Sequence, residues 1–158
     1  MDIDPRVQQA YSLIQRHFIE EGRAPHYTEL APALGVGVEE ARRLQREAIE
    51  LGVGAWFVAG TDFIESFAPF YNVPNGTSIS VDGEQRWFAQ CGLEALAMRC
   101  VFPGREVRIE DACLDCGDSV VVVMKDEDIL EVSPETAVGH FNPPYNPERR
   151  AGLTGSFV

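Results

Sequence analysis

Three amphipathic segments open the chain, and their apolar side chains recur at the three- and four-residue steps that predict helices. Two alternating runs follow, separated by Gly60, and they predict a β-hairpin. The expected bounds are 5–21, 28–34 and 38–51 for the helices, and 55–59 and 62–67 for the strands. Three helices followed by a hairpin are the pattern of a winged helix-turn-helix.

The pattern changes at residues 68–76, which are rich in Pro, Asn and Gly and therefore predict a linker. Beyond the linker, alternating and β-branched runs predict strands at 77–81, 86–88, 106–109, 119–124 and 129–132. One helix is expected between them, with an inner face made by Leu93, Leu96, Ala97 and Cys100. The sequence thus predicts an α+β protein: a winged helix-turn-helix-like domain (1–67), a linker (68–76), and a small domain (77–158) with a mixed or antiparallel sheet and one or two helices.

Charge limits the partners that we expect. The formal net charge is −12, and an acidic protein is repelled by nucleic-acid phosphates and by anionic membranes. Arg42, Arg43 and Arg46 on the third helix favour DNA binding, but residues 1–60 hold six Arg against nine Asp or Glu, and a groove-reading helix normally lies in a basic field. We therefore disfavour nucleic acid and interpret the arginines as a solvated, ion-paired face. Their expected partners are Glu39, Glu40, Glu47 and Glu50.

The four cysteines all lie within residues 91–116. The chain shows neither an apolar run of membrane-spanning length nor a signal peptide, so we expect a cytoplasmic protein without a membrane partner. Cysteines remain reduced in that compartment, and their clustering indicates thiol chemistry or metal binding more than disulfides. The alternative is that some of them are small core residues, and for Cys100 we prefer that interpretation.

Cys91 lies where a predicted strand gives way to a helix, and Glu94 follows three residues later. A thiol at a helix N-terminus is close to free backbone N–H groups and to the positive end of the helix dipole, which favour the thiolate. Glu94 lies on the same helical face, so the pair combines a soft metal ligand with a proton source. The alternative is that Glu94 only stabilises the first helical turn and Cys91 only fills core space.

Cys113 and Cys116 belong to a Cys-x-x-Cys-Gly turn that has the shape of a metal knuckle. Tetrahedral zinc usually needs a second such pair, so a zinc site requires the fold to bring Cys91 and Cys100 close to the turn. A thioredoxin-like redox role is disfavoured because the pair precedes a strand. The alternative is a tight turn that tolerates cysteine.

These residues resemble motifs of the organomercurial lyase (alkylmercury lyase) family. The segment WFAQCGLEAL, residues 87–96, is similar to the family signature aromatic-x-Cys-Ala-Leu-Asp-x-Leu. Further similarities are the Phe102-Pro103-Gly104-Arg105 turn, Cys113 with Gly117, the Asp82-Gly83-x-x-Arg86 hairpin and the stretch 119–134. The resemblance covers nearly the whole chain, since the family joins a winged-helix-like domain to a small α/β catalytic domain.

The resemblance implies that Cys91 is the first of two family cysteines that hold mercury. Glu94 stands where the family has an aspartate that delivers the proton replacing mercury on carbon. The register places Gly155 or Ser156 at the second cysteine, so one of the two thiolates that activate the carbon–mercury bond is missing. Cys113 or Cys116 substitutes for it only if the turn folds over Cys91.

The leading hypothesis is an alkylmercury lyase-like enzyme that binds a small organomercurial or Hg(II) through Cys91, with Glu94 as the acid. Mercury is then substrate or product ion, no cofactor is required, and the winged-helix part is a packing and lid element. A rival is a non-catalytic protein that binds thiol-bound metal through Cys91, Cys113 and Cys116, with zinc as an alternative ion at the last two. A third is a metal-responsive transcriptional regulator.

Overall fold

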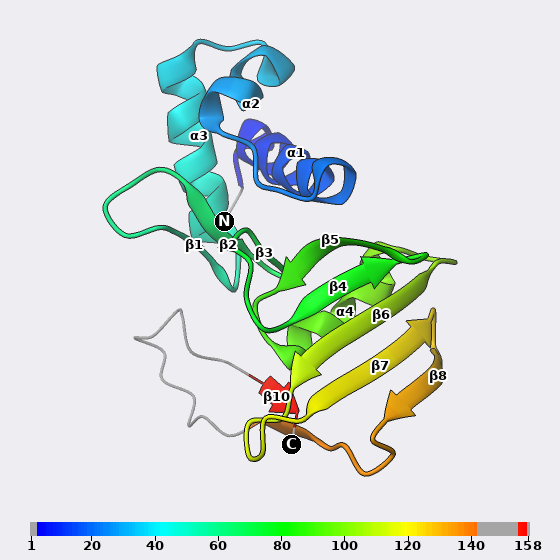
Figure 1. Ribbon diagram of the computed structural model, residues 1–158. Coiled ribbons are helices and arrows are strands. Elements are labelled where there is room, and N and C mark those ends of the chain that lie inside the picture. The colour runs from blue at the N-terminus through cyan, green and yellow to red at the C-terminus, as the bar shows by residue number, and fades with distance from the viewer. Residues whose placement is uncertain (1–2, 142–154, 158) are drawn as a thin grey trace. The chain divides into compact units, whose positions relative to one another are not determined.

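The computed structural model describes residues 3–141 and 155–157, and the chain divides into two compact units, Met1–Ala68 and Pro69–Val158. The first unit holds three helices and a β-hairpin, and the second holds an antiparallel sheet with one helix (Figure 1). This is the predicted α+β composition. Among the described residues, no helix has the length and apolar character needed to cross a membrane.

The first unit follows the predicted elements closely. Its elements are α1 (Pro5–Glu21), α2 (Tyr27–Leu34), α3 (Val38–Leu51), β1 (Ala55–Phe57) and β2 (Ile64–Phe67). The Asp4 carboxylate caps α1 by accepting from the backbone N–H of Arg6 at 2.8 Å. The helices bury Ile14, Phe18 and Leu44 completely or nearly so, as the apolar spacing predicted.

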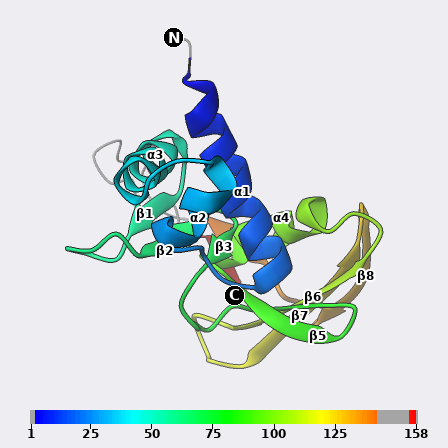
Figure 2. The ribbon, with the colours of Figure 1, turned by 90° about the horizontal axis from the view of Figure 1, so that it is seen from above.

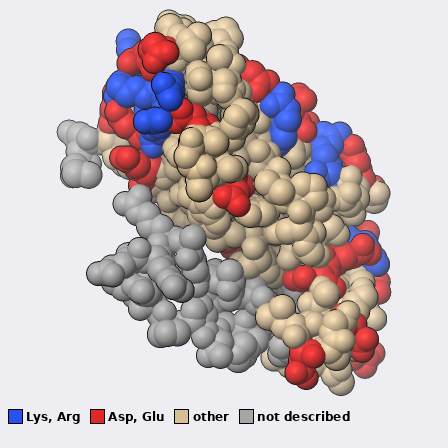
Figure 3. Space-filling model, turned by 60° about the vertical axis from the view of Figure 1, so that its left-hand side comes forward, with Lys and Arg blue, Asp and Glu red and all other residues tan. Residues whose placement is uncertain are grey.

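The arginines of α3 are ion-paired, as expected, but with a partner that the sequence analysis missed. Arg43 hydrogen-bonds Glu40 and Glu47. The guanidinium Nε atoms of Arg42 and Arg46 donate to opposite oxygens of Asp62, at 2.7 and 2.6 Å. Asp62 lies between β1 and β2, too far along the chain for a helical-spacing rule to find. Blue and red atoms accordingly lie next to one another in Figure 3.

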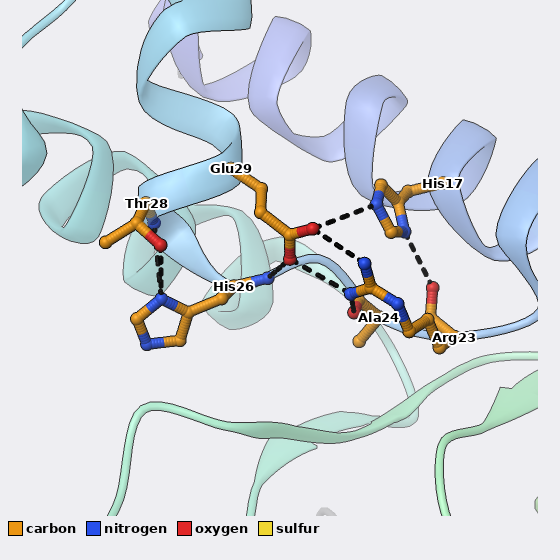
Figure 4. Close-up of polar contacts among 6 residues, drawn as sticks. All are labelled: His17, Arg23, Ala24, His26, Thr28 and Glu29. Carbon is orange, nitrogen blue, oxygen red and sulfur yellow. Dashed lines mark hydrogen bonds and ion pairs between the residues drawn. The ribbon is translucent and has the colours of Figure 1, made fainter.

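A second polar cluster joins α1 to the start of α2 (Figure 4). Arg23 donates two hydrogen bonds to the Glu29 carboxylate, at 2.9 and 2.7 Å, and the backbone N–H of His26 donates a third at 2.8 Å. The hydrogen bonds from Arg23 and then His26 lower the pKa of Glu29 to about 2. The Nδ1–H of His17 donates to the Arg23 carbonyl, 3.0 Å away, so the His17 ring has a structural role.

The second unit is an antiparallel sheet in which neighbouring strands run in the order β3-β5-β4-β6-β7-β8. The strands are β3 (Phe70–Tyr71), β4 (Ser78–Val81), β5 (Glu84–Ala89), β6 (Glu106–Ala112), β7 (Ser119–Lys125) and β8 (Asp128–Ser133). The segment predicted as a linker contains β3, and Phe70 is fully buried. A separate pair, β9 (Gly139–Phe141) and β10 (Gly155–Phe157), is also antiparallel. The proline-rich segment 142–147 lies outside the described residues.

Helix α4 (Gly92–Val101) covers one face of this sheet, as Figure 2 shows, and contacts β5 and β6. It buries Ala95 and Met98 completely, and Phe102, just beyond its end, packs against Trp87 in a tilted arrangement with ring centroids 4.8 Å apart. The predicted inner face was wrong: Leu93 is 51% exposed and Cys100 is exposed. The large aromatic ring of Phe102 anchors the helix against the sheet. The side chains on the same side of the helix, Ala95 and Met98, therefore pack on the sheet.

Candidate functional site

Cys91 is the N-cap residue of α4, as predicted. The strand alternation that buries Trp87 and Ala89 continues to Cys91, which is only 5% exposed. The helix begins here because the Cys91 carbonyl accepts a hydrogen bond from the Ala95 N–H at 2.9 Å. The sulfur therefore lies at the positive end of the helix, on the side that faces the core.

Glu94 is the third residue of α4 and is half-buried. Cys91 at the N-cap and Glu94 at the third position both belong to the first turn of α4. Burial raises the pKa of Glu94 from 4.5 to about 7, because a carboxylate loses hydration when it is withdrawn from water. A carboxylic acid that is half-protonated near neutral pH therefore lies one turn from the thiol of Cys91, which is suited to proton transfer.

A hydrogen-bonded segment, Asn75 to Thr77, joins the ends of β5 and β6 on either side of β4. The Asn75 side-chain amide donates to the carbonyl of Ala89 at 2.8 Å, and Ala89 lies two residues before Cys91. The Thr77 hydroxyl donates to the carboxylate of Asp111 at 3.0 Å, and Asp111 lies two residues before Cys113. In Figure 1 the arrowheads of β5 and β6 point the same way, and Ser78 pairs with both Phe88 and Glu110. Cys91 and Cys113 therefore follow strands that end on the same side of the sheet.

Cys113 and Cys116 lie in the turn between β6 and β7. The backbone N–H groups of Cys116 and Asp115 hydrogen-bond the Cys113 sulfur and lower the pKa of that thiol, and a hydrogen bond with Cys116 adds to the effect. The N–H of Asp118 favours the Cys116 thiolate, but the hydrogen bond with Cys113 and desolvation prevail and raise the pKa of Cys116. The turn thus favours the thiolate of Cys113 over that of Cys116.

The structure does not combine all these thiols in one cluster. Within residues 3–141 and 155–157, no three His, Cys, Asp or Glu side chains are grouped so that they could hold a metal ion. Cys91, Cys113 and Cys116 are therefore not grouped around a single ion, and metal binding through these cysteines, with zinc at Cys113 and Cys116, remains a prediction. Cys100 is exposed on α4 and is part of neither the Cys91–Glu94 pair nor the Cys113–Cys116 turn.

Strand β10 lies beside α4. It contains Gly155 and Ser156, the two positions at which the resemblance places the second family cysteine. The chain thus brings the backbone of this position close to the helix that begins at Cys91, but it carries no thiol there.

Among solved structures, the chain is similar to the crystal structure of the mercury-bound form of MerB2. The TM-score is 0.67 and the sequence identity is 17%, and the similarity covers 98% of this chain and 81% of that chain. At that identity the similarity shows a shared fold: N-terminal helices followed by an antiparallel sheet with one helix. No curated protein sequence matches the chain significantly.

The sequence also matches the family described as MerB, alkylmercury lyase, over residues 70–154. The match takes in more than half of the chain, including Cys91, Glu94 and the Cys113–Cys116 turn. The protein belongs to the alkylmercury lyase family, which confirms the resemblance drawn from the motifs around Cys91.

Proposed function

We propose that this protein cleaves carbon–mercury bonds by protonolysis, with Cys91 as the mercury ligand and Glu94 as the proton donor. The observation that carries the proposal is the carboxyl group of Glu94, whose pKa is raised to about 7 by burial. It lies one helical turn from a buried cysteine in a member of the alkylmercury lyase family. A solved relative of the same fold is described as mercury-bound.

The proposed reaction has two steps. The Cys91 thiol exchanges for the leaving ligand of an R–Hg–X compound, forming the Hg–S bond while its proton leaves with X. Glu94 then transfers its carboxyl proton to the carbon of R, the carbon–mercury bond breaks, and RH departs with the bonding electron pair. Mercury stays on Cys91 as Hg(II), and the Glu94 carboxylate regains a proton from water.

The chain lacks the second family thiol, so a thiol from solution completes the coordination of mercury in this proposal. Cys91 is 5% exposed, which favours a small apolar organic group over a charged one. Charge that develops during the reaction is also less shielded by water in such a site.

Release of benzene from phenylmercury by the reduced protein in excess monothiol tests the proposal. We expect Cys91→Ser to lose both mercury binding and benzene release. Glu94→Gln is expected to bind phenylmercury but to release no benzene, since an amide has no proton of suitable acidity. Cys100→Ser, which removes an exposed thiol from the same helix, is the matched control and is expected to behave as wild type. Unchanged benzene release in Glu94→Gln would refute the role of the acid.

The regulator hypothesis receives no support from α3. Arg42, Arg43 and Arg46 each contact a carboxylate of their own unit. A helix that reads DNA needs its cations for phosphates and bases, so these arginines support a solvated, structural face instead. A salt-dependent shift of DNA mobility by the intact protein would overturn this interpretation.

A further inference from the structure

The turn between β6 and β7 holds two sulfur atoms in one place. The Cys113 N–H donates to the Asp118 carbonyl at 2.8 Å, and the Gly117 N–H donates to the Cys113 carbonyl at 2.9 Å. Gly117 has a backbone φ of +78°, which residues other than glycine rarely adopt. The backbone thus closes the turn, and the thiols of Cys113 and Cys116 hydrogen-bond each other across it.

The number of ligands decides which ions suit this pair. Zinc in structural sites takes four ligands, whereas no third His, Cys, Asp or Glu of the described residues joins the two thiols in a metal-binding group. Soft ions that prefer thiolate sulfur are satisfied by fewer ligands, and Hg(II) forms stable complexes with two thiolates. The N–H groups of Asp115 and Cys116 that hydrogen-bond the Cys113 sulfur stabilise the negative charge that such an ion requires.

The pair is also separate from Cys91. Strand β4 lies between β5, which leads to Cys91, and β6, which leads to Cys113, so these strands are about 10 Å apart. Cys91 does not join Cys113 and Cys116 in a group of described side chains that could hold one metal ion. The Cys113–Cys116 turn is therefore a separate thiol group.

We propose that the Cys113–Cys116 turn is a second, independent site, which binds one soft, two-coordinate cation of the Hg(II) class through both sulfurs. An ion carried by two small thiols exchanges onto the turn: two Hg–S bonds form, two break, and the two cysteine protons pass to the released thiols. Cys116 is exposed and Leu114 between the cysteines is 72% exposed, so a thiol-bound ion reaches the turn directly. No carbon–mercury cleavage is involved, and the proposal does not rest on the proposed function.

The test uses the full-length Cys91→Ala variant, reduced and supplied with one equivalent of HgCl₂ in a large excess of a monothiol. A chelating pair survives this competition because its second thiol acts at high effective concentration, whereas a single thiol is displaced. We expect one Hg(II) per chain in native mass spectrometry, with thiolate-to-mercury charge-transfer absorption in the ultraviolet. Adding Cys116→Ser is expected to weaken retention about 100-fold or more. Adding Cys100→Ser instead is the matched control and is expected to change nothing.

Two results would overturn the proposal: no retained Hg(II) in Cys91→Ala, or equal retention after Cys116→Ser is added. Cys116 is exposed, so its replacement is compatible with folding, which circular dichroism checks. Cys91→Ala/Cys113→Ser removes the other sulfur and is expected to give the same loss. Because Cys91 is absent throughout, failure here leaves the benzene-release test untouched, and failure of that test leaves this one untouched.

Discussion

Replacing Glu94 by Gln tests whether burial controls this carboxyl group, without any substrate. The folded protein holds the proton of Glu94 up to a pH of about 7, whereas the ordinary pKa is 4.5. A carboxyl whose folded pKa is raised gives full stability below its unfolded pKa, and that stability is lost as the pH rises towards the folded value. Wild type should therefore lose stability between about pH 4.5 and 7, and Glu94→Gln should lose none from this position.

The magnitude follows from that interval of about 2.5 pH units, at roughly 1.4 kcal/mol for each. The full penalty in wild type is about 3 kcal/mol, and about 2 to 3 kcal/mol of it develops between pH 5 and pH 8. Gln is neutral, similar in size, and suited to the same capping position. We therefore expect the variant to exceed wild type by about 2 to 3 kcal/mol at pH 8, but by less than about 1 kcal/mol at pH 5.

Urea unfolding of the reduced protein at the two pH values measures this difference. Each unit contains one tryptophan, Trp56 in the first and Trp87 in the second, so a Trp56→Phe background makes fluorescence report on the unit that contains Glu94. Glu127→Gln, which changes an exposed carboxyl in the β7–β8 turn of the same unit, is the control and should change stability by less than about 0.5 kcal/mol at either pH. An equal effect of Glu94→Gln at pH 5 and pH 8 would refute the raised pKa.

Three further predictions concern other parts of the chain. Phe102→Ala removes the buried ring that packs on Trp87 and should lower the free energy of unfolding by about 3–5 kcal/mol; a loss below about 1 kcal/mol in urea unfolding would contradict its anchoring of α4. Glu29 has a lowered pKa and contributes stability above its unfolded pKa that is lost as the pH falls towards about 2. Its carboxyl is 39% exposed, so Glu29→Gln should reduce acid sensitivity by less than about 1 kcal/mol in acid titrations followed by circular dichroism. Ser156→Cys or Gly155→Cys supplies a thiol on β10 beside α4, and at least one should raise benzene release about tenfold or more if mercury activation needs two thiolates; no gain from either would show that β10 does not hold the missing ligand.

The elements of the first unit could be predicted because their signals are local. Apolar spacing gave the bounds of α3 as they are observed, and the Asp4–Pro5 pair marked the start of α1. The candidate site was predictable for the same reason: a cysteine between a strand and a helix, with a glutamate one turn later, is visible in the sequence. The raised pKa of Glu94 was not predictable, since it depends on burial by the folded sheet.

The errors arose where distant contacts decide the outcome. Leu93 and Cys100 form as good an apolar stripe in the sequence as Ala95 and Met98, and only the packing of Phe102 on Trp87 selects between them. The interaction of Asp62 with Arg42 and Arg46 crosses 20 and 16 residues, beyond any helical-spacing rule. The linker 68–76 was predicted from its composition, which carries no sign that Phe70 pairs with Ala89 in the sheet.

The origin of the acidity of Glu94 has a practical consequence. Withdrawal from water raises the pKa of this group. Dissolved salt weakens attraction and repulsion between exposed charges but does not rehydrate a covered carboxyl. Proton delivery at this position should therefore proceed equally well in dilute and in saline media.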